Sequence, residues 1–430
     1  MKNLEECRRE IDAIDREMIR LFEERMQVAE QVAAYKLKHG LPVLDAKREE
    51  EVVKNRVGLL SSPAYAPLCE QFVRHTMKLS RTRQKSLMES HSCDPKILSV
   101  TYGGGEYDIL LGRGILQKVA EHLPLARKVL VVTDSGVPSA YAQKVAESCL
   151  DPTLVTLPMG EATKSLASLE HLLSVMLQKG FTRSDCVVAV GGGVVGDLSG
   201  FAASVYMRGI DFYNIPTTLL SQLDSSIGGK VAVDFLGVKN IVGAFYQPQK
   251  VLIDPDVLKT LDRRQFSAGL AEAIKMAATC DADLFQLIEQ SEDIEKDIDR
   301  IILGGISVKR SVVEQDPKEA GLRRVLNFGH TVGHAIESMG EGKWLHGECV
   351  AMGMLTMCSE KVANRLKPLL QKYNLPTEIP QDKEKLLALM RHDKKAKGKT
   401  VTVVYCPEIG SFSFLETKDT ELSSHLEKTV

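Results

Sequence analysis

Three of the ten histidines stand close together in the second half of the chain, in the strings NFGHTVGHA and WLHGE. A helix would present His330 and His334 on one face, because they are four residues apart, and His346 follows after a short break. Imidazole nitrogens bind zinc-like divalent ions, and a carboxylate could complete a set that leaves coordination positions open. A lone pair of histidines at this spacing more often has a structural role, so spacing alone leaves both interpretations open.

Cationic side chains stand beside many of the glycine-rich and polar turns. Lys230 closes the string DSSIGGK, and the others follow similar segments. Such a concentration of ammonium and guanidinium groups predicts an anionic, phosphorylated substrate. The members of this set are Arg208, Lys230, Lys239, Lys275, Lys309 and Arg323.

The string GGGVVGD, which starts at Gly191, follows the apolar run VVAV and has the spacing G-x-G-x-x-G. Glycines there let the backbone approach a pyrophosphate, and the N-terminus of the next helix favours its charge. A ribose-binding acid about twenty residues later is not clearly present, and Asp134, at the end of an earlier strand, is the better candidate. The string GEATKS at 160–165 is a second polar turn. The alternative is a tight turn with a purely structural role.

Around these motifs, apolar β-branched runs at 129–134, 187–190 and 215–218 alternate with helical stretches. This alternation predicts a parallel sheet with helical crossovers. From about Pro255 onward helical patterns dominate. We therefore expect an α/β nucleotide-binding domain at 98–256 and a helical domain at 257–430.

The first ninety residues have a different pattern. No Gly or Pro occurs from Leu4 to Leu37, and apolar residues recur at helical spacing, which predicts one helix of about 50 Å. Its apolar face is longer than a small domain is wide, so we expect a partner chain. Asp45 is a candidate N-cap of a second helix, and a third follows Pro67. Residues 85–97 lose the period, so the domain is expected to end at 90 and a linker to span 91–97.

Three cations, Arg8, Arg25 and Lys36, fall within the apolar stripe of the long helix instead of opposite it. Burying an unpaired cation is costly, and a ligand with carboxylates would remove that cost, especially if Arg48 joins from the second helix. Long side chains could equally extend to the rim of a coiled coil. Periodicity does not decide between the two.

Composition excludes several classes of protein. A chain of 430 residues implies two or three domains, and 44% hydrophobic with 26% charged residues is typical of a globular protein with no membrane span. The N-terminus lacks the apolar run of a signal peptide, and nine scattered cysteines make a disulfide framework improbable, so we expect a cytoplasmic protein. A net charge of -2 predicts no general attraction to nucleic acid.

Residues 1–90 resemble the all-helical chorismate mutases, which are intertwined helical dimers. The resemblance implies rearrangement of chorismate to prephenate, with Arg8 of the other subunit, Arg25 and Arg48 holding the two carboxylates. It also implies that Lys36 and Gln84 stabilise charge on the breaking ether oxygen, and that Glu49 holds the substrate hydroxyl. The implied site residues are Arg8, Arg25, Lys36, Asp45, Arg48, Glu49, Ser80 and Gln84.

From about residue 98 to the C-terminus the chain resembles 3-dehydroquinate synthase, through GGGVVGDLSGF, IPTTLL, LDSSIGGK, KNIVGAF, GLAEAIK, LNFGHTVGHAIE and HGE in order. The resemblance implies zinc, with cobalt possible, bound by Glu272, His330 and His346, and leaves His334 for substrate and proton handling. The implied NAD contacts are Asp134, Glu161, Lys164, Gly192, Gly193, Asp197, Thr217, Thr218, Lys230 and Lys239. The implied substrate contacts are Asp224, Lys230, Lys239, Asn240, Lys275, Lys309, Glu319, Arg323, Asn327 and one or both of Lys394 and Lys395, with Arg208 from a neighbouring subunit.

Together the resemblances imply an all-α mutase domain, an α/β NAD-binding domain and an α-helical metal- and substrate-binding domain in one homodimeric or larger enzyme of the shikimate pathway. The synthase would convert 3-deoxy-D-arabino-heptulosonate 7-phosphate to 3-dehydroquinate and phosphate. Two alternatives remain. The N-terminal helices could be a dimerisation or allosteric module without catalysis, and the C-terminal part could be a related sugar-phosphate cyclase or polyol dehydrogenase.

Overall fold

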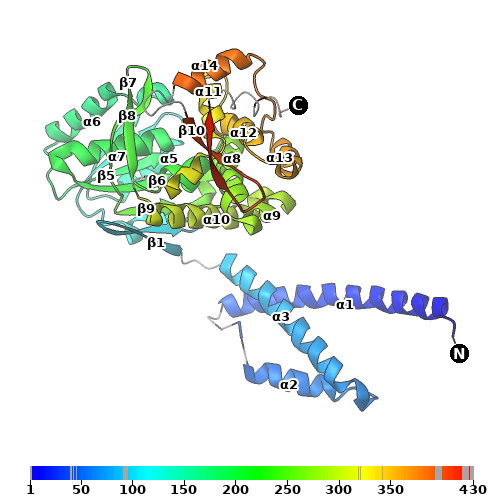
Figure 1. Cartoon of the computed structure of the whole chain (residues 1–430). Coiled ribbons are helices and arrows are strands. Elements are labelled where there is room, and N and C mark those ends of the chain that lie inside the picture. Colours follow the sequence, from blue (N-terminus) through cyan, green and yellow to red (C-terminus); the bar gives the residue numbers. More distant parts are fainter. Residues whose placement is uncertain are drawn as a thin grey trace. The chain divides into compact units, whose positions relative to one another are not determined.

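The computed structural model describes residues 2–38, 41, 43–44, 46–90, 95–317, 319, 321–340, 342–392, 400–418 and 426. Its contacts divide the chain into two compact units, residues 1–94 and 95–430, drawn in blue and in cyan to red (Figure 1). Each unit has its own arrangement of elements and is described by itself. Among the described residues, no helix has the length and the apolar run that crossing a membrane requires.

The N-terminal unit consists of three helices and a short 3-10 turn. Helix α1 (Leu4–Lys38) is the predicted long helix, and α3 (Ala66–Ser90) packs against both α1 and α2 (Ala46–Val57), with η1 (Pro63–Tyr65) before α3. Many apolar side chains of α1 remain exposed in the single chain, among them Ile11, Ile14 and Leu21. The long helix is confirmed, and the expected partner chain stays a prediction.

A seven-stranded sheet forms the first half of the C-terminal unit, in the order β1-β2-β9-β6-β5-β3-β4. Only the β1–β2 hairpin is antiparallel, so the predicted parallel sheet is confirmed. Strand β1 begins at Lys96, inside the segment expected to be linker. The strands are β1 (Lys96–Tyr102), β2 (Gly105–Leu111), β3 (Lys128–Asp134), β4 (Asp151–Leu157), β5 (Cys186–Gly191), β6 (Asp211–Pro216) and β9 (Lys250–Ile253).

Both faces of this sheet are covered, because successive side chains of its central strands enter different cores. In β3, Leu130 and Val132 belong to a core with α6 (Leu166–Gln178) and α7 (Gly193–Val205), whereas Val129 and Val131 belong to a core with α5 (Ser139–Glu147). Short helical turns η2 (Ile115–Lys118), α4 (Val119–His122), η3 (Glu161–Thr163), η4 (Tyr206–Arg208), η5 (Ser221–Ser225) and η6 (Pro255–Thr260) connect the elements. A separate hairpin, β7 (Lys230–Phe235) and β8 (Val238–Phe245), packs on α7.

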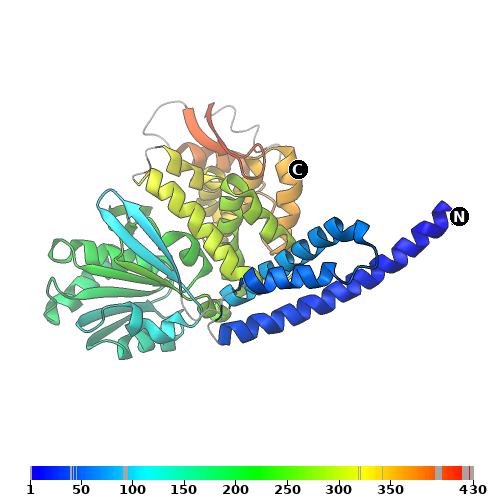
Figure 2. The same cartoon turned by 90° about the horizontal axis from the view of Figure 1, so that it is seen from below.

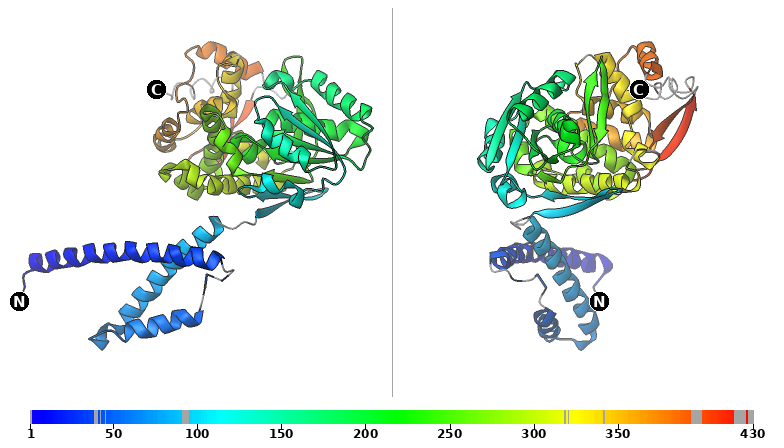
Figure 3. Two further views of the ribbon diagram at one scale, coloured as in Figure 1. Left: turned by 180° about the vertical axis from the view of Figure 1, so that it is seen from behind. Right: turned by 90° about the vertical axis from the view of Figure 1, so that its left-hand side faces the viewer.

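The second half of this unit is helical and lies beside the sheet, in yellow-green to orange (Figure 2). Its helices are α8 (Arg263–Cys280), α9 (Ala282–Gln290), α10 (Ile294–Gln315), η7 (Leu322–Asn327), α11 (His330–Gly340), α12 (His346–Thr356), α13 (Glu360–Lys372) and α14 (Lys383–His392). A hairpin that the helical prediction did not include, β10 (Thr400–Tyr405) and β11 (Ser413–Lys418), follows in red (Figure 3). The predicted boundary at 256 falls between β9 and α8 and stays a prediction.

Helices α11 and α12 approach closely because glycines face each other between them. A Cβ added at Gly353 on α12 would stand 2.0 Å from the carbonyl oxygen of Gly329, just before α11. A backbone oxygen cannot move aside for an added Cβ as the end of a flexible side chain can. These glycines therefore hold the start of α11, which carries His330, against α12, which begins at His346.

We expect Gly353→Ala to force α11 and α12 apart and to lower the free energy of unfolding by about 1–3 kcal/mol or more. Thermal unfolding of the full chain would measure this change. Gly103→Ala is a suitable control, because a Cβ at Gly103 would meet no atom within 4 Å. An unfolding midpoint equal to that of the control would contradict the close-packing argument.

Candidate active sites

The three histidines form one cluster at the junction of α11 and α12. Ring centroids of His330 and His334 are 5.1 Å apart, those of His330 and His346 also 5.1 Å, and those of His334 and His346 5.7 Å. One nitrogen of each ring lies within 4.8 Å of the corresponding nitrogens of the others. His330 on α11 and His346 on α12 are therefore as close as the two histidines on α11.

Glu272 of α8 places a carboxylate against this cluster. Its Oε1 lies 3.8 Å from Nε2 of His346 and 4.0 Å from Nε2 of His330, and the side chain is fully buried. Lys275 forms an ion pair with Oε2, yet neither oxygen has a hydrogen bond of acceptable geometry within the described structure. A buried carboxylate that faces two imidazole nitrogens fits a divalent cation, and the donor set suits zinc or cobalt.

The other nitrogen of each of these two rings is already engaged. His330 Nδ1 lies 3.2 Å from the carbonyl oxygen of Phe328, and His346 Nδ1 lies 3.0 Å from Oε2 of Glu337. Each Nε2 is therefore the nitrogen that faces Glu272. Burial lowers the pKa of His330 well below its ordinary value, which favours the neutral, metal-binding form of the ring.

Glu337 is a site residue that sequence reasoning missed. It lies on α11 one turn after His334, and Lys239 Nζ of β8 approaches its Oε1 at 2.6 Å. Burial opposes ionisation, but the hydrogen bond and charge of His346, together with Lys239, lower the pKa of Glu337 to about 2. The available signal was its spacing, because Glu337 shares a helical face with His330 and His334.

A second group of charges surrounds Asp224 in η5. Lys309 of α10 forms an ion pair with its carboxylate and donates to its backbone oxygen at 2.5 Å. Burial lowers the pKa of Lys309, and the nearby cations Arg323 and Lys275 lower it further. The pKa of Asp224 is also lowered, because the charges of Lys309 and Lys275 outweigh its burial. An ionised carboxylate among several cations leaves an environment that favours a bound anion.

Glu319 joins three other predicted substrate residues. It forms an ion pair with Lys230 and accepts a hydrogen bond from Asn327 Nδ2 at 2.9 Å. Arg323 is buried nearby, where its Nη1 donates to the Pro317 carbonyl oxygen at 2.8 Å, and burial lowers its pKa. The structure thus brings together Lys230 of β7, Glu319 of the segment between α10 and η7, and Arg323 and Asn327 of η7.

The β7–β8 hairpin connects the histidine cluster with the glycine loop. Lys239 contacts Glu337, and the next residue, Asn240, accepts a hydrogen bond from Lys164. Lys164 Nζ also donates to Asp197 Oδ2 of α7 at 2.5 Å. A chain of polar contacts therefore runs from the helical half to the nucleotide half of the unit.

The glycine loop lies at the carboxyl end of β5, where Gly192 is the N-cap of α7. A Cβ at Gly192 would stand 3.1 Å from the Thr218 side chain, and a Cβ at Gly193 would stand 3.1 Å from that of Ser225. The backbone amide of Thr217 donates to Gly191 at 2.9 Å. This close packing leaves the N-terminus of α7 available to a phosphate group.

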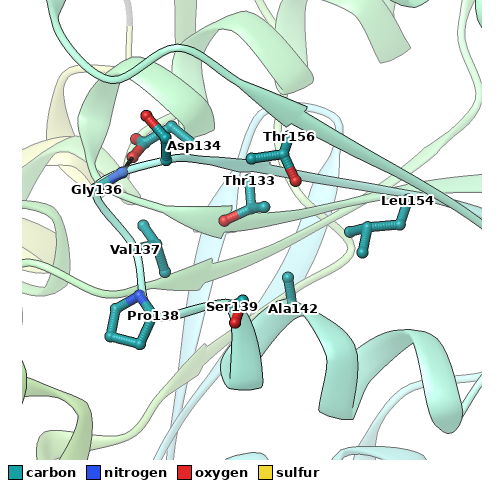
Figure 4. A pocket seen from close by; sticks show the side chains of 10 residues that line it. Thr133, Asp134, Gly136, Val137, Pro138, Ser139, Ala142, Leu154 and Thr156 are labelled. Carbon is teal, nitrogen blue, oxygen red and sulfur yellow. Dashed lines mark hydrogen bonds between the residues drawn. The ribbon is translucent and has the colours of Figure 1, made fainter.

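Asp134 lies at the carboxyl end of β3, the neighbour of β5 in the sheet. Its Oδ1 accepts a hydrogen bond from the backbone of Gly136 at 2.7 Å, beside a cavity of about 430 Å³ (Figure 4). Strand ends, the Pro138 turn and the start of α5 line the cavity, with Leu154 and Thr156 of β4 on its far side. Glu161, in η3, follows the end of β4. The cavity lies at the carboxyl edge of the sheet, where parallel sheets commonly bind nucleotides.

In the N-terminal unit, Arg25 donates hydrogen bonds to Ser80 Oγ and, at 3.2 Å, to the Thr76 carbonyl oxygen. Gln84, one turn after Ser80, is buried, and its Oε1 has no hydrogen-bond partner in the described structure. Burial lowers the pKa of Arg25, and the charge of Arg56 lowers it further. Arg56 was not among the sequence candidates. The two cations, Arg25 and Arg56, favour an anionic ligand beside Ser80.

Other predicted mutase residues are less closely gathered. Lys36 Nζ donates to the Val43 carbonyl oxygen at 2.7 Å, Glu49 is ion-paired with Arg81, and Arg48 is exposed and 3.3 Å from Glu51. Arg8 is exposed and stands about 25 Å from Arg25 along α1, at about 1.5 Å per residue. It cannot join the same site within one chain.

Arg208 is exposed too, in a turn where Met207 and Arg208 both have positive φ. Asp45, Lys394 and Lys395 lie outside the described residues.

Known families match these two units. The 3-dehydroquinate synthase N-terminal and C-terminal family models match residues 154–268 and 269–396, and the chorismate mutase type II model matches residues 7–85. The 3-dehydroquinate synthase of Latilactobacillus sakei is 39% identical over 345 residues, covering 76% of this chain and 97% of the relative. The chain belongs to the 3-dehydroquinate synthase family. It also carries an N-terminal chorismate mutase type II domain.

A further relative, the 3-dehydroquinate synthase of Pelobacter propionicus, is 42% identical over 73% of this chain and 94% of its own. Among solved structures, 2-deoxy-scyllo-inosose synthase, complexed with carbaglucose-6-phosphate, NAD+ and Co2+, has a TM-score of 0.70 and 25% identity, over 78% of this chain and 100% of that chain. The 2-epi-5-epi-valiolone synthase of Streptomyces hygroscopicus subsp. jinggangensis, with NAD+ and Zn2+, has a TM-score of 0.68 and 26% identity, over 75% and 96%. The synthase family and the mutase domain establish the chain as a two-enzyme fusion.

The environment of Asp197 leads to a pH-dependent prediction for the expected NAD site. Burial raises the pKa of Asp197 to about 6, although Lys164 opposes this shift. As the pH falls through about 6, we expect protonation to weaken the ion pair with Lys164 and to reduce NAD affinity by at most about tenfold per pH unit, because one proton is involved. Calorimetric titration with NAD across this range would measure the change.

A change in folding stability caused by Asp197 would not explain a loss of NAD affinity as the pH falls. Because the folded pKa lies above the ordinary value, the stability that Asp197 contributes is present at low pH and is lost as the pH rises through about 6. The variant Asp197→Asn should show a nearly flat profile over the same range. The assignment would be wrong if the unaltered chain and the variant had the same pH profile.

Proposed function

We propose that residues 95–430 convert 3-deoxy-D-arabino-heptulosonate 7-phosphate to 3-dehydroquinate and phosphate, with NAD and a zinc or cobalt ion. The observation that carries this proposal is the fully buried Glu272 carboxylate, which accepts no hydrogen bond from the described residues and faces Nε2 of His330 and His346. Solved relatives with the same fold are complexed with NAD+ and Co2+ or Zn2+. The nearby cations fit a phosphorylated, acidic substrate.

When bound, the metal would lower the pKa of the substrate alcohol, and NAD would accept and then return its hydride. The residues of the chain bind and orient the reactants. Glu272, His330 and His346 would hold the metal, while Lys275 and Lys309 would neutralise anionic groups of the substrate. His334 lies within the same cluster and would hold or release a proton at the substrate.

The nucleotide would lie along the carboxyl edge of the sheet. The glycine loop at the start of α7 would approach the pyrophosphate, and Asp134 would accept hydrogen bonds from the ribose. Thr217 and Thr218 follow β6 and pack against the glycine loop, at Gly191 and Gly192. Lys164 and Asp197 would then lie between the nucleotide and the substrate groups on the hairpin.

Incubation with the heptulosonate phosphate tests this function. We expect release of inorganic phosphate and formation of 3-dehydroquinate without net NADH, because the hydride returns to the substrate in each turnover. Stoichiometric NADH on a polyol would instead favour the dehydrogenase alternative, and a cyclitol product from a hexose phosphate would favour the cyclase alternative. The relatives at 39–42% identity are dehydroquinate synthases, whereas the compared cyclases are 25–26% identical.

The histidine roles can be separated by metal content. We expect His346→Ala to lower zinc affinity by more than the about 100-fold that outer-shell changes cost, because one protein ligand is lost. His334→Ala should retain a full zinc equivalent in elemental analysis and lose turnover. Full zinc retention by His346→Ala, or metal loss only in His334→Ala, would assign the ligand role to His334.

For residues 1–90 we propose rearrangement of chorismate to prephenate in a homodimer. Arg25 and Gln84 line the α1–α3 site, where Arg25 would orient a substrate carboxylate and the Nε2 amide group of Gln84 would donate to the ether oxygen. Arg8 would reach the site of a second copy, because it is too distant from Arg25 in its own chain. The exposed apolar residues of α1 supply the surface that a second copy would cover.

We expect Arg25→Ala to reduce mutase turnover by about 100- to 1,000-fold, since a charged group that orients the substrate is removed. Prephenate formation measures the loss, and circular dichroism should show an intact helical unit. Arg74→Ala is the matched control, because Arg74 is an exposed α3 arginine paired with Glu50 and Glu70. Unchanged turnover in Arg25→Ala would refute its role, and no turnover in the unaltered chain would favour a non-catalytic module.

A further inference from the structure

The carboxylate of Glu337 contacts two other side chains of the metal and substrate region. One oxygen lies 3.0 Å from His346 Nδ1, and the other accepts a hydrogen bond from Lys239 Nζ at 2.6 Å. The side chain is mostly buried, with 18% of its surface exposed. Glu337 therefore contacts both a proposed metal ligand, His346, and a proposed substrate or nucleotide contact, Lys239.

We propose that Glu337 is a positioning residue that orients the His346 ring toward the metal and ties it to Lys239 of the β7–β8 hairpin. This inference rests on the proposed metal-dependent function. Glu337 acts through its neighbours, because its own oxygens point at His346 and Lys239 and are occupied by them.

The geometry defines which nitrogen of His346 is available. A carboxylate oxygen accepts hydrogen bonds, so Nδ1 of His346 donates its proton to Glu337. In the neutral ring Nε2 then carries the lone pair, and this atom faces Glu272 Oε1 at 3.8 Å. Rotation of the ring would break the Nδ1 hydrogen bond, so Glu337 fixes both the tautomer and the direction of the ring.

The ring of His330 also has Nδ1 engaged and Nε2 facing Glu272, but its Nδ1 partner is a backbone atom. Its Nδ1 faces the backbone carbonyl oxygen of Phe328, which no side-chain substitution removes. The orientation of His346 depends instead on a side chain from the neighbouring helix. A side-chain substitution can therefore remove the group that orients His346 but not the one that orients His330. Substituting Glu337 tests how the orientation of His346 is maintained.

The second oxygen of Glu337 extends this role to the hairpin. Lys239 and Asn240 are adjacent on β8, and Asn240 is bonded to Lys164, which pairs with Asp197. A single carboxylate therefore links the ring of His346 to the hairpin that contacts the nucleotide half.

The test compares metal affinity in the full-length unaltered chain and in Glu337→Gln. After metal removal with a chelator, zinc is added back in competition with a chromophoric chelator. We expect Glu337→Gln to bind zinc about 10- to 100-fold more weakly, the usual effect of losing an outer-shell partner. The visible spectrum of the Co2+ form should change as well, because the ring direction alters the ligand field. Glu337→Asp, which keeps the carboxylate, should recover part of the affinity.

Glu348→Gln is the matched control. Glu348 is a buried carboxylate on α12, two residues after His346, and both of its oxygens accept hydrogen bonds from Arg264, at 2.6 and 2.8 Å. We expect this variant to lower the thermal unfolding midpoint and to leave zinc affinity little changed. An equal loss of affinity in Glu348→Gln would overturn the proposal, because general loosening of α12 would then explain it.

Unchanged zinc affinity and an unchanged Co2+ spectrum in Glu337→Gln would also overturn the proposal. This outcome differs from failure of the proposed function, in which the unaltered chain itself would bind neither zinc nor cobalt tightly. Thermal unfolding of the metal-free variants establishes that each is folded before its affinity is compared.

Discussion

The burial of the Glu272 carboxylate is the constraint on which the synthase site depends. A charge removed from water must be compensated by positive charge or by hydrogen bonds, and here one oxygen is paired with Lys275 while the other faces two imidazoles. Helices α8, α11 and α12 must therefore meet at one point. Glycines at their contacts allow this, since a Cβ at Gly347 would stand 1.9 Å from the Ala268 carbonyl oxygen.

The β7–β8 hairpin makes the two halves of this unit into one site. Its residues pair with Glu319 and Glu337 on the helical side and with Lys164 on the nucleotide side. Excess positive charge persists around Asp224, where burial and neighbouring cations lower the pKa of Lys309. A phosphorylated acid, as in the proposed reaction, would compensate these charges.

The sequence by itself determined the class of each domain and most of the candidate residues. Hydrophobic periodicity sufficed for α1 and for the parallel strands, because helices and strands place apolar side chains at different, recognisable spacings. The resemblance carried by the ordered motifs implied Glu272, and not His334, as the partner of His330 and His346, and this assignment stays a prediction. The hairpin β10–β11 escaped prediction, although the run TVTVVY from Thr400 has strand character, because the surrounding helical pattern outweighed a single short segment.

Only the tertiary structure decided how these residues meet. Glu337 had a helical face in common with His330, but its partners Lys239 and His346 come from β8 and α12, and no local spacing encodes such a contact. The pairing of Glu49 with Arg81 and the proximity of Arg56 to Arg25 likewise depend on helix packing. Local periodicity reports which side of an element is buried, whereas the identity of its neighbours follows from the packing of distant segments.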